Sequence, residues 1–463
     1  MFNKAGWIEK QQLLLTGDEK RDIKPKRRYL HFDNRVSQIS PQLQAYIFNK
    51  SDVTNHAFFP FIRYVKKIRK LNKHGGIKVK PRPISYAAHL DSLIYSWYAF
   101  QLSELYEKML IKAGLCDSVL AYRSGNGSNI DHACKAFRAI QDLKSSHVVC
   151  IDIKSFFDNL NHSQLKAKWL KLLQLEDEAL SSLPNDHYAV YKAITRYSHI
   201  SIDAIYKALE LDPKNPQPVE KTKLCKVKDF RSKLVSAGLV QRNKRDSGVG
   251  IPQGSSMSAV LANMYMLEFD IAASNKAKEL GGLYYRYSDD VLFAVPSIVP
   301  AGEIESFVRK EVKSVALTIG ESKTEKYIFQ FEKGELISRN LDTGHKKSLN
   351  YLGLSFDGRR VLLKHASLAS YQRKAVAAVK SALKHKYRKD VKMPKRLLYE
   401  RYTKMGKSNY QSYVNRCIEG LSKYGFSSAY LKRQASDFFV QKTIKRLDLV
   451  IKMKVQNRKK YHK

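Results

Sequence analysis

The stretch LYYRYSDDVLFAV, residues 283–295, places two adjacent carboxylates, Asp289 and Asp290, between two apolar runs. Neighbouring carboxylates repel each other, and a buried carboxylate is unstable unless something compensates its charge. Two apolar runs around a short Ser-Asp-Asp segment are typical of a tight β-hairpin. These residues therefore predict either a simple turn, in which Asp is common, or a rigid site for a divalent cation.

A third carboxylate, Asp152, ends the apolar strand-like run VVCID. Mg²⁺ prefers oxygen ligands and often bridges carboxylates to substrate phosphates. Two such ions about 4 Å apart can activate an attacking hydroxyl and stabilise the leaving oxygen of a phosphoryl transfer. If the two strand ends meet, Asp152, Asp289 and Asp290 predict a metal site of this kind.

Charge is the most unusual feature of the composition. The 463 residues include 83 Lys and Arg against 43 Asp and Glu, a formal net charge of +40. Residues 361–463 alone hold 27 basic and 5 acidic side chains, a surplus of 22. Such an excess predicts a polyanion partner, because basic side chains release counterions from phosphates. A surface that is basic only for solubility is the alternative, but solubility does not need so much charge of one sign.

The cysteines and the apolar runs indicate the compartment. Five cysteines occur and none forms a C-x-x-C pair, which argues against a disulfide framework or a zinc site. We therefore expect a reducing, cytoplasmic location. We expect no membrane partner, because no apolar run reaches the length of about 18 residues that a spanning helix needs.

The residue patterns predict a mixed helical and stranded chain. Residues 70–85 suggest a basic β-hairpin, and apolar residues at helical spacing follow in 94–109. A Gly/Asn/Ser loop opens a helix near Ser128 or Asn129. Residues 165–245 predict a largely helical insertion, and the pattern from 365 to the end is helical and basic.

Taken in order, the motifs resemble those of the reverse transcriptases, in particular the bacterial retron, group II intron and stand-alone defence-associated enzymes. YSDD (287–290) resembles the family's Tyr-x-Asp-Asp motif, and DIKSFF (152–157) resembles its first palm motif. The other similar segments are GIPQGSSMSAVLANMYM (250–266), LTIGESKTEK (317–326), YLGLSF (351–356), RPIS (82–85) and AYRSGNGSN (121–129). Two departures are the long separation of Asp152 from Gly250 and Ser288, where the bacterial groups usually carry Ala.

The resemblance implies an α+β right-hand polymerase with fingers, an antiparallel palm sheet with helices, and a helical thumb. The implied division is an N-terminal extension (1–60), fingers (61–147), a palm (148–356) that contains the 165–245 insertion, and a basic helical thumb and C-terminal region (357–463).

The resemblance also implies roles for the acids. Asp152, Asp289 and Asp290, with the carbonyl of Ile153, would hold two Mg²⁺ ions, for which Mn²⁺ could substitute. Lys323 would protonate the leaving pyrophosphate. For a chain with this many lysines, an ordinary surface lysine is the alternative.

Nucleotide-binding roles follow in the same way. Phe157 would abut the sugar and exclude a 2′-hydroxyl, with Phe156 as the alternative. Gln253 and Gly254 would approach the incoming nucleotide, and Arg82 with Lys80, or with Lys78 in its place, would clamp the triphosphate.

Nucleic-acid contacts are implied for Tyr287 and Ser288. Arg123 would either contact phosphate or brace the fingers. The implied thumb begins with Tyr371, Arg373 and Lys374, which would follow a duplex backbone, whereas a solvated helical face is the alternative for each.

The implied function is RNA-directed DNA polymerase. The partners would be an RNA template, a DNA product and dNTPs, and the template would be a companion noncoding RNA copied in antiphage defence. A second copy or a protein partner is left open. The alternatives are untemplated or protein-primed DNA synthesis, a non-catalytic RNA-binding scaffold, and a group II intron maturase.

Overall fold

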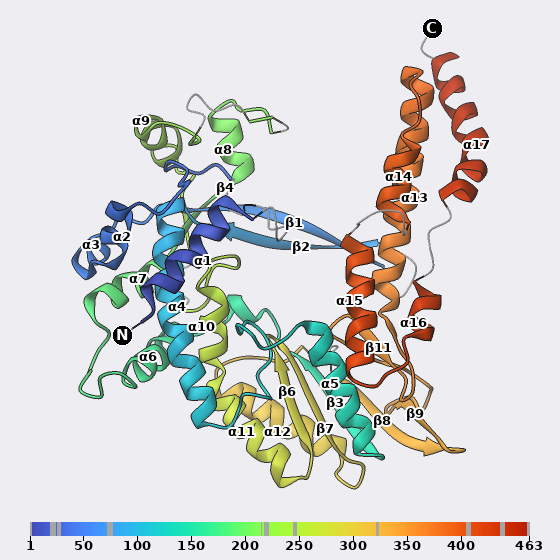
Figure 1. Ribbon diagram of the computed structural model, residues 1–463. Helices are drawn as coiled ribbons and strands as arrows, with labels where there is room; N and C mark the ends of the chain where they lie inside the picture. Colours follow the sequence, from blue (N-terminus) through green and yellow to red (C-terminus); the bar gives the residue numbers. More distant parts are fainter. Residues whose placement is uncertain are drawn as a thin grey trace.

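An antiparallel sheet at the centre of the molecule holds the predicted hairpin (Figure 1). The computed structural model describes residues 2–18, 25, 29–71, 77–213, 215–216, 222–243, 248–320, 324–403, 409–435 and 440–460. The sheet order is β6-β7-β3-β8-β9. Its strands are β6 (Leu283–Tyr287), β7 (Asp290–Pro296), β3 (Ser146–Asp152), β8 (Glu325–Glu332) and β9 (Glu335–Asn340).

We call this five-stranded sheet the palm sheet. Both of its faces are buried, which explains why β3 and β7 are apolar without a break. Val149 and Phe293 face a core that also contains α4 (His89–Lys112), α6 (His162–Leu173) and three following helices. Those three are α10 (Ser258–Tyr265), α11 (Leu267–Glu279) and α12 (Ala301–Ser314). Val148 and Leu292 face a second core with α5 (Asn129–Asp142), which begins at Ser128 with a capping box to Asp131.

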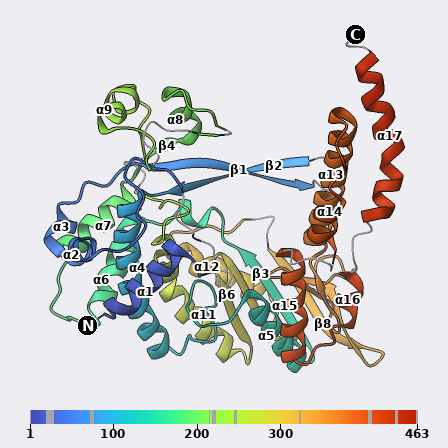
Figure 2. The ribbon, with the colours of Figure 1, turned by 45° about the horizontal axis from the view of Figure 1, so that its top comes forward.

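The predicted basic hairpin is longer than the pattern suggested. It consists of β1 (Phe61–Leu71) and β2 (Ile77–Tyr86), paired antiparallel from Ile62–Tyr86 outward. Residues 61–86 contain nine Lys or Arg and no Asp or Glu. In both views the hairpin extends over the palm toward the C-terminal helices (Figures 1 and 2).

The 165–245 segment is largely helical, but it also adds strands to the hairpin. Its helices after α6 are α7 (Asn185–Thr195), α8 (Ile202–Ala208), α9 (Val227–Asp229) and the π-helix η2 (Phe230–Val235). The strands β4 (Ser198–Ser201) and β5 (Gln241–Arg242) complete a second sheet, β2-β1-β4-β5. Such short strands leave too little periodicity to be recognised in the sequence.

The N-terminal residues form three helices beside α4: α1 (Lys4–Thr16), α2 (Pro41–Phe48) and α3 (Lys50–Thr54). Trp7 of α1 is fully buried and meets Trp97 of α4 with ring centroids 5.5 Å apart. Trp7, together with the buried Leu15, therefore fixes a helix that has almost no apolar stripe of its own.

The C-terminal part divides between two cores. A small sheet of β10 (Leu349–Tyr351), β11 (Leu354–Phe356) and β12 (Val361–Leu363) joins the second palm core together with α15 (Asn409–Lys423) and α16 (Ala429–Gln434). In contrast, α13 (His365–Lys389), α14 (Lys395–Tyr402) and α17 (Val440–Lys460) share a separate core. We call these three helices the C-terminal arm, which projects from the palm (Figure 2). Among the described residues, no helix combines the length and apolarity needed to cross a membrane.

Candidate active site

Strand register brings the three predicted carboxylates to one end of the palm sheet. Asp152, the last residue of β3, lies directly opposite Asp290, the first residue of β7. Asp289 belongs to the two-residue turn between β6 and β7, and its carbonyl accepts a hydrogen bond of 3.0 Å from the Ile153 amide. Opposite residues in antiparallel strands lie about 5 Å apart, so the acids lie close together. They do so although Asp152 precedes Ser288, the first residue of the turn, by 136 positions in the sequence.

The turn that carries Asp289 is held in an unusual conformation. Ser288 has φ 60°, in the left-handed region that favours glycine in two-residue hairpin turns. Its side chain is 5% exposed, and its carbonyl accepts a hydrogen bond of 3.1 Å from Arg286 Nη1. Backbone strain of this kind persists only where the surroundings fix it.

Arg286 supplies that fixation from beneath the turn. It is fully buried and pairs with Asp270 of α11 through Nε–Oδ1 at 2.6 Å and Nη2–Oδ2 at 2.7 Å. Its Nη1 also donates to Asn263 of α10 at 3.2 Å, and Tyr284 donates to Asp270 at 2.6 Å. Burial is the largest single influence and would lower the pKa of Arg286, but the charge and hydrogen bonds of Asp270, together with Tyr106 and Tyr284, raise it above its usual value. The turn that carries Asp289 therefore rests on a charged, hydrogen-bonded base.

The carboxylates fit a metal ion whose coordination shell is completed by the substrate. Among the residues that the structure describes, no three His, Cys, Asp or Glu side chains already form a cluster that could hold an ion. Asp152 and Asp289 are half-buried, whereas Asp290 is exposed. Mg²⁺ is commonly held by one or two carboxylates together with substrate phosphates and water, and this donor set matches that pattern.

A short 3₁₀ turn, η1 (Phe156–Asp158), follows the Asp152 strand. Phe156 is 3% exposed and belongs to the palm core, whereas Phe157 is half-buried at the edge of that core. The Phe157 carbonyl accepts a 2.9 Å hydrogen bond from the Ile251 amide. Of the two rings, only Phe157 is accessible beside Asp152.

The Pro-Gln-Gly loop contacts the edge strand of the basic hairpin. Arg82 Nε donates to Gln253 Oε1 at 3.1 Å, and the Ser85 amide donates to the Gln253 carbonyl at 2.8 Å. A Cβ on Gly254 would lie 2.4 Å from the Ser85 carbonyl oxygen, and Gly254 has φ 118°, so only glycine allows this approach. Lys80 is exposed two residues from Arg82 and lies on the same side of β2.

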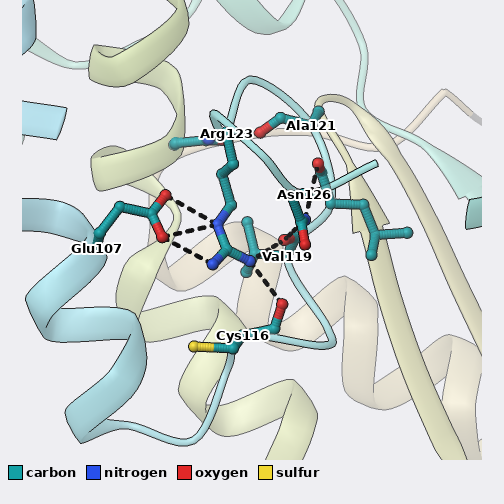
Figure 3. Close-up of polar contacts among 8 residues, drawn as sticks. Glu107, Cys116, Val119, Ala121, Arg123 and Asn126 are labelled. Carbon is teal, nitrogen blue, oxygen red and sulfur yellow. Dashed lines mark hydrogen bonds and ion pairs between the residues drawn. The ribbon is translucent and has the colours of Figure 1, made fainter. Parts of the chain in front are cut away.

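Arg123 is engaged inside the protein (Figure 3). Its Nε and Nη2 donate to the Glu107 carboxylate at 2.9 and 2.7 Å, and its Nη1 donates to the carbonyls of Cys116 and Val119 at 2.5 and 2.8 Å. Its side chain is 7% exposed. Of the two roles that the sequence left open, this geometry matches bracing of the fingers.

Lys323 is outside the described residues. The other three predicted residues belong to α13. Tyr371, on α13, stacks on Tyr410 at 3.7 Å and donates to the Tyr402 carbonyl at 2.9 Å, so its ring joins helices together and is not presented outward. Arg373 and Lys374, on the same helix, are exposed.

The base of the turn is the part of the site that sequence reasoning missed. Arg286 is visible as a charged residue in the apolar run YYRY, and a buried arginine requires a buried acid. Nothing in the sequence indicates that Asp270 or Asn263, each on another helix, would be its partners.

Comparison with known proteins accounts for this arrangement. A family model described as reverse transcriptase (RNA-dependent DNA polymerase) matches residues 197–356, which include the Pro-Gln-Gly loop and the turn of Ser288 and Asp289. This part of the chain is similar to a reverse transcriptase domain. The palm acid Asp152 precedes the matched range and joins the domain through strand pairing with β7. The right-hand polymerase fold expected from the motifs is confirmed.

Solved structures with a similar arrangement include apo telomerase from Candida tropicalis, at 15% identity and TM-score 0.37, covering 97% of this chain and 67% of that one. Its form truncated from the C-terminal domain has 14% identity and TM-score 0.35, covering 65% of this chain and 54% of that one. A Sicinivirus 3Dpol RNA-dependent RNA polymerase has 15% identity and TM-score 0.37, covering 89% and 71%. The chain thus spans about half the length of the truncated telomerase chain. No curated protein sequence matches it.

Proposed function

We propose that this reverse transcriptase domain extends a nucleic-acid 3′-hydroxyl with dNTPs on an RNA template. The observation that carries the proposal is the register of β3 and β7, which sets Asp152 opposite Asp290 beside the strained turn of Asp289. In the reaction, the 3′-oxygen would attack the α-phosphate, a phosphodiester bond would form, and pyrophosphate would leave. Such catalysis rests mainly on positioning and electrostatic stabilisation.

Asp152 and Asp289, supported by Asp290 and the Ile153 carbonyl, would hold two Mg²⁺ ions, or Mn²⁺ in their place, which when bound would offset the charge of the reacting phosphates. Arg82 and Lys80 would receive the triphosphate, and Gln253 and Gly254 would border the nucleotide. Lys323 remains a proposal for protonating pyrophosphate. Tyr287 and Ser288 would contact the primer end beside the turn.

The finer assignment concerns template and biology. We propose a companion noncoding RNA as template and antiphage defence as the setting, on the resemblance of the motifs to stand-alone bacterial enzymes. Untemplated or protein-primed synthesis, a non-catalytic RNA-binding scaffold and a group II intron maturase are the competing functions. Sequencing the DNA product made with and without the co-purified RNA distinguishes templated synthesis from untemplated or protein-primed synthesis. Intron RNA as substrate tests the maturase.

Removal of the acids tests the catalytic assignment. Asp152→Ala and Asp289→Ala should each lower dNTP incorporation by about 1000-fold or more, because each removes a carboxylate that would hold the Mg²⁺ ions against the charge of the reacting phosphates. Incorporation of labelled dNTP on an RNA template is measured, with circular dichroism to establish folding. Asp177→Ala, which alters an exposed acid between α6 and α7, is the control. Mg²⁺-dependent synthesis retained in both acid variants would refute the assignment.

The accessible ring of Phe157 is proposed to select dNTPs. Phe157→Ala should raise the ratio of rNTP to dNTP incorporation by about tenfold or more, because space opens beside the 2′-carbon. Phe156→Leu is the matched control, since Phe156 is buried in the core. An unchanged ratio in Phe157→Ala would remove this residue from the selection of sugars.

A further inference from the structure

A tyrosine beside the catalytic turn is exposed although the residues on either side of it are firmly held. Tyr122 is 51% exposed and has φ 63°, which is unusual for an aromatic residue. Its hydroxyl accepts a hydrogen bond of 3.2 Å from Ser288 Oγ. The ring therefore lies next to the turn that carries Asp289.

The neighbours of Tyr122 fix this conformation from both sides. Ala121 is buried, and its carbonyl accepts a 2.8 Å hydrogen bond from Asn263 Nδ2. Arg123 is held by the Glu107 carboxylate and by two backbone carbonyls (Figure 3). The strain at Tyr122 is thus imposed by its surroundings and keeps a large apolar ring in solvent.

The same contacts connect Tyr122 with the catalytic turn. Val119 forms a parallel bridge with Arg286, and the Leu120 amide donates to the Arg286 carbonyl at 2.9 Å, so the segment that leads to Tyr122 runs along β6. Asn263 bonds both to Ala121 and to Arg286, whose Nη1 reaches the Ser288 carbonyl. One buried hub therefore positions both the tyrosine and the turn.

About half of Tyr122 is exposed to solvent, and a nucleobase offers a flat face on which such a ring can stack.

We infer that the Tyr122 ring is a binding surface for the base-paired end of the primer–template duplex, where it contacts the terminal nucleotide and holds it beside Asp289. This inference rests on the proposed polymerase function and adds a residue to it. The ring face does the binding, while the hydroxyl, through Ser288, keeps the ring aligned with the turn.

Two substitutions separate the ring from the hydroxyl. Tyr122→Ala should weaken binding of a DNA primer on an RNA template by about 10- to 100-fold, because base stacking on the ring is removed. Tyr122→Phe should stay within about fivefold of the wild type, since only one hydrogen bond disappears. The KM for dNTP should change by less than about twofold in both. Tyr188→Ala, at a half-exposed tyrosine of α7, is the matched control.

The measurement is fluorescence anisotropy of a labelled primer–template, together with the signal of 2-aminopurine at the primer 3′ end. In the wild type, 2-aminopurine fluorescence should change on binding, and in Tyr122→Ala this change should be absent. Equal affinities and equal 2-aminopurine signals in wild type and Tyr122→Ala would overturn the inference. So would a Tyr122→Phe variant as defective as Tyr122→Ala.

Incubation with labelled dNTP but no primer tests whether the Tyr122 hydroxyl itself serves as the primer. Label that attaches to the wild type and disappears in Tyr122→Phe would also overturn the inference, because the hydroxyl would then be the attacking group. Binding is measured without turnover. A wild type that binds the duplex but never extends it would therefore refute the polymerase proposal, while the contact would still be judged by affinity.

Discussion

Positive charge has opposite surroundings in the palm and in the C-terminal arm. Arg286 is fully buried and Arg123 nearly so, and each directs its donors to carboxylates and carbonyls. On α13, Lys374, Lys380 and Lys384 are exposed, and none of them forms an ion pair with an acid that the structure describes. The first group fixes geometry, whereas the second is available to a polyanion.

The difference teaches how a chain with a net charge of +40 can still have a well-defined centre. Buried cations are stable only when they are paired and hydrogen-bonded, so each one specifies its partners. Exposed cations on a helix specify nothing about the fold, and their repulsion is relieved when a phosphate backbone binds.

Breaking the buried pair should have the largest effect. Arg286→Met leaves Asp270 buried without its counter-charge, and we expect a loss of about 3–5 kcal/mol in the free energy of unfolding. The double variant Asp270→Leu/Arg286→Met should recover much of that loss, because no uncompensated charge remains. Urea denaturation followed by circular dichroism measures both.

Activity should not recover with stability in the double variant. The Ser288 carbonyl would still lack its hydrogen bond from Arg286, and the turn that carries Asp289 would be unsupported. dNTP incorporation well below that of the wild type is expected even where the protein is folded. A double variant as active as the wild type would mean that the pair serves stability alone.

Neutralising the exposed group should have an intermediate effect that depends on salt. Replacing Arg373, Lys374, Lys380 and Lys384 with Gln should make the slope of log K against log salt shallower by about 0.7–0.9 for each phosphate that is no longer neutralised. Binding of structured RNA is titrated between low and physiological salt. Lys310→Gln/Lys313→Gln, on exposed positions of α12, is the control. An unchanged slope would assign the charge of α13 to another partner.

Arg123→Lys tests a buried arginine in the same titration of RNA binding against salt. Lysine cannot reproduce the planar fork of hydrogen bonds to Glu107, so the free energy of unfolding should fall. The slope of log K against log salt should stay as in the wild type. A shallower slope would return Arg123 to the phosphate-contacting role.

The buried, neutral histidines should give the smallest effect, on the pH dependence of stability. Burial lowers the pKa of His31 to about 3 and those of His187 and His199 to about 4. Their folded pKa values lie below the unfolded value near 6.5, so their contribution to stability is complete above pH 6.5 and declines as pH falls toward 4. Between pH 7 and 5.5, His31→Phe should lose about 1 kcal/mol less stability than the wild type, as measured by denaturation. An identical pH dependence in both would contradict the buried, neutral state.

The sequence predicts the elements whose patterns are local. The apolar strands of Asp152 and of Asp289–Asp290, the helix that begins near Ser128 or Asn129 and the helical C-terminal region all appear in the structure. The meeting of the three acids could be inferred only from the family motifs, because strand pairing is set by the whole sheet. For the same reason β4, four residues long, cannot be distinguished in the sequence from the helical insertion around it.

The parts that the sequence does not predict depend on side-chain partners far apart in the chain. The exposure of Tyr122 follows from Asn263, which bonds to the carbonyl of Ala121 although 142 positions separate the two. Tyr371 is predicted from the basic, Tyr-containing pattern of its helix to contact a duplex, and in the structure its ring stacks on Tyr410. The sequence around a tyrosine at the start of a basic helix is the same whether its ring contacts a duplex or packs on another helix. Only the packing distinguishes these two cases.

The second palm core has a consequence for the synthesis of this protein. It joins residues from 120 to 148 and from 285 to 363 with others between 414 and 435, so the helices that complete it come late in the chain. A ribosome delivers the three acids long before it delivers α15 and α16. Because α15 packs on α5 and α16 packs on β12, a nascent chain stopped before residue 414 leaves apolar surface of α5 and β12 uncovered. Exposed apolar surface of this kind favours aggregation.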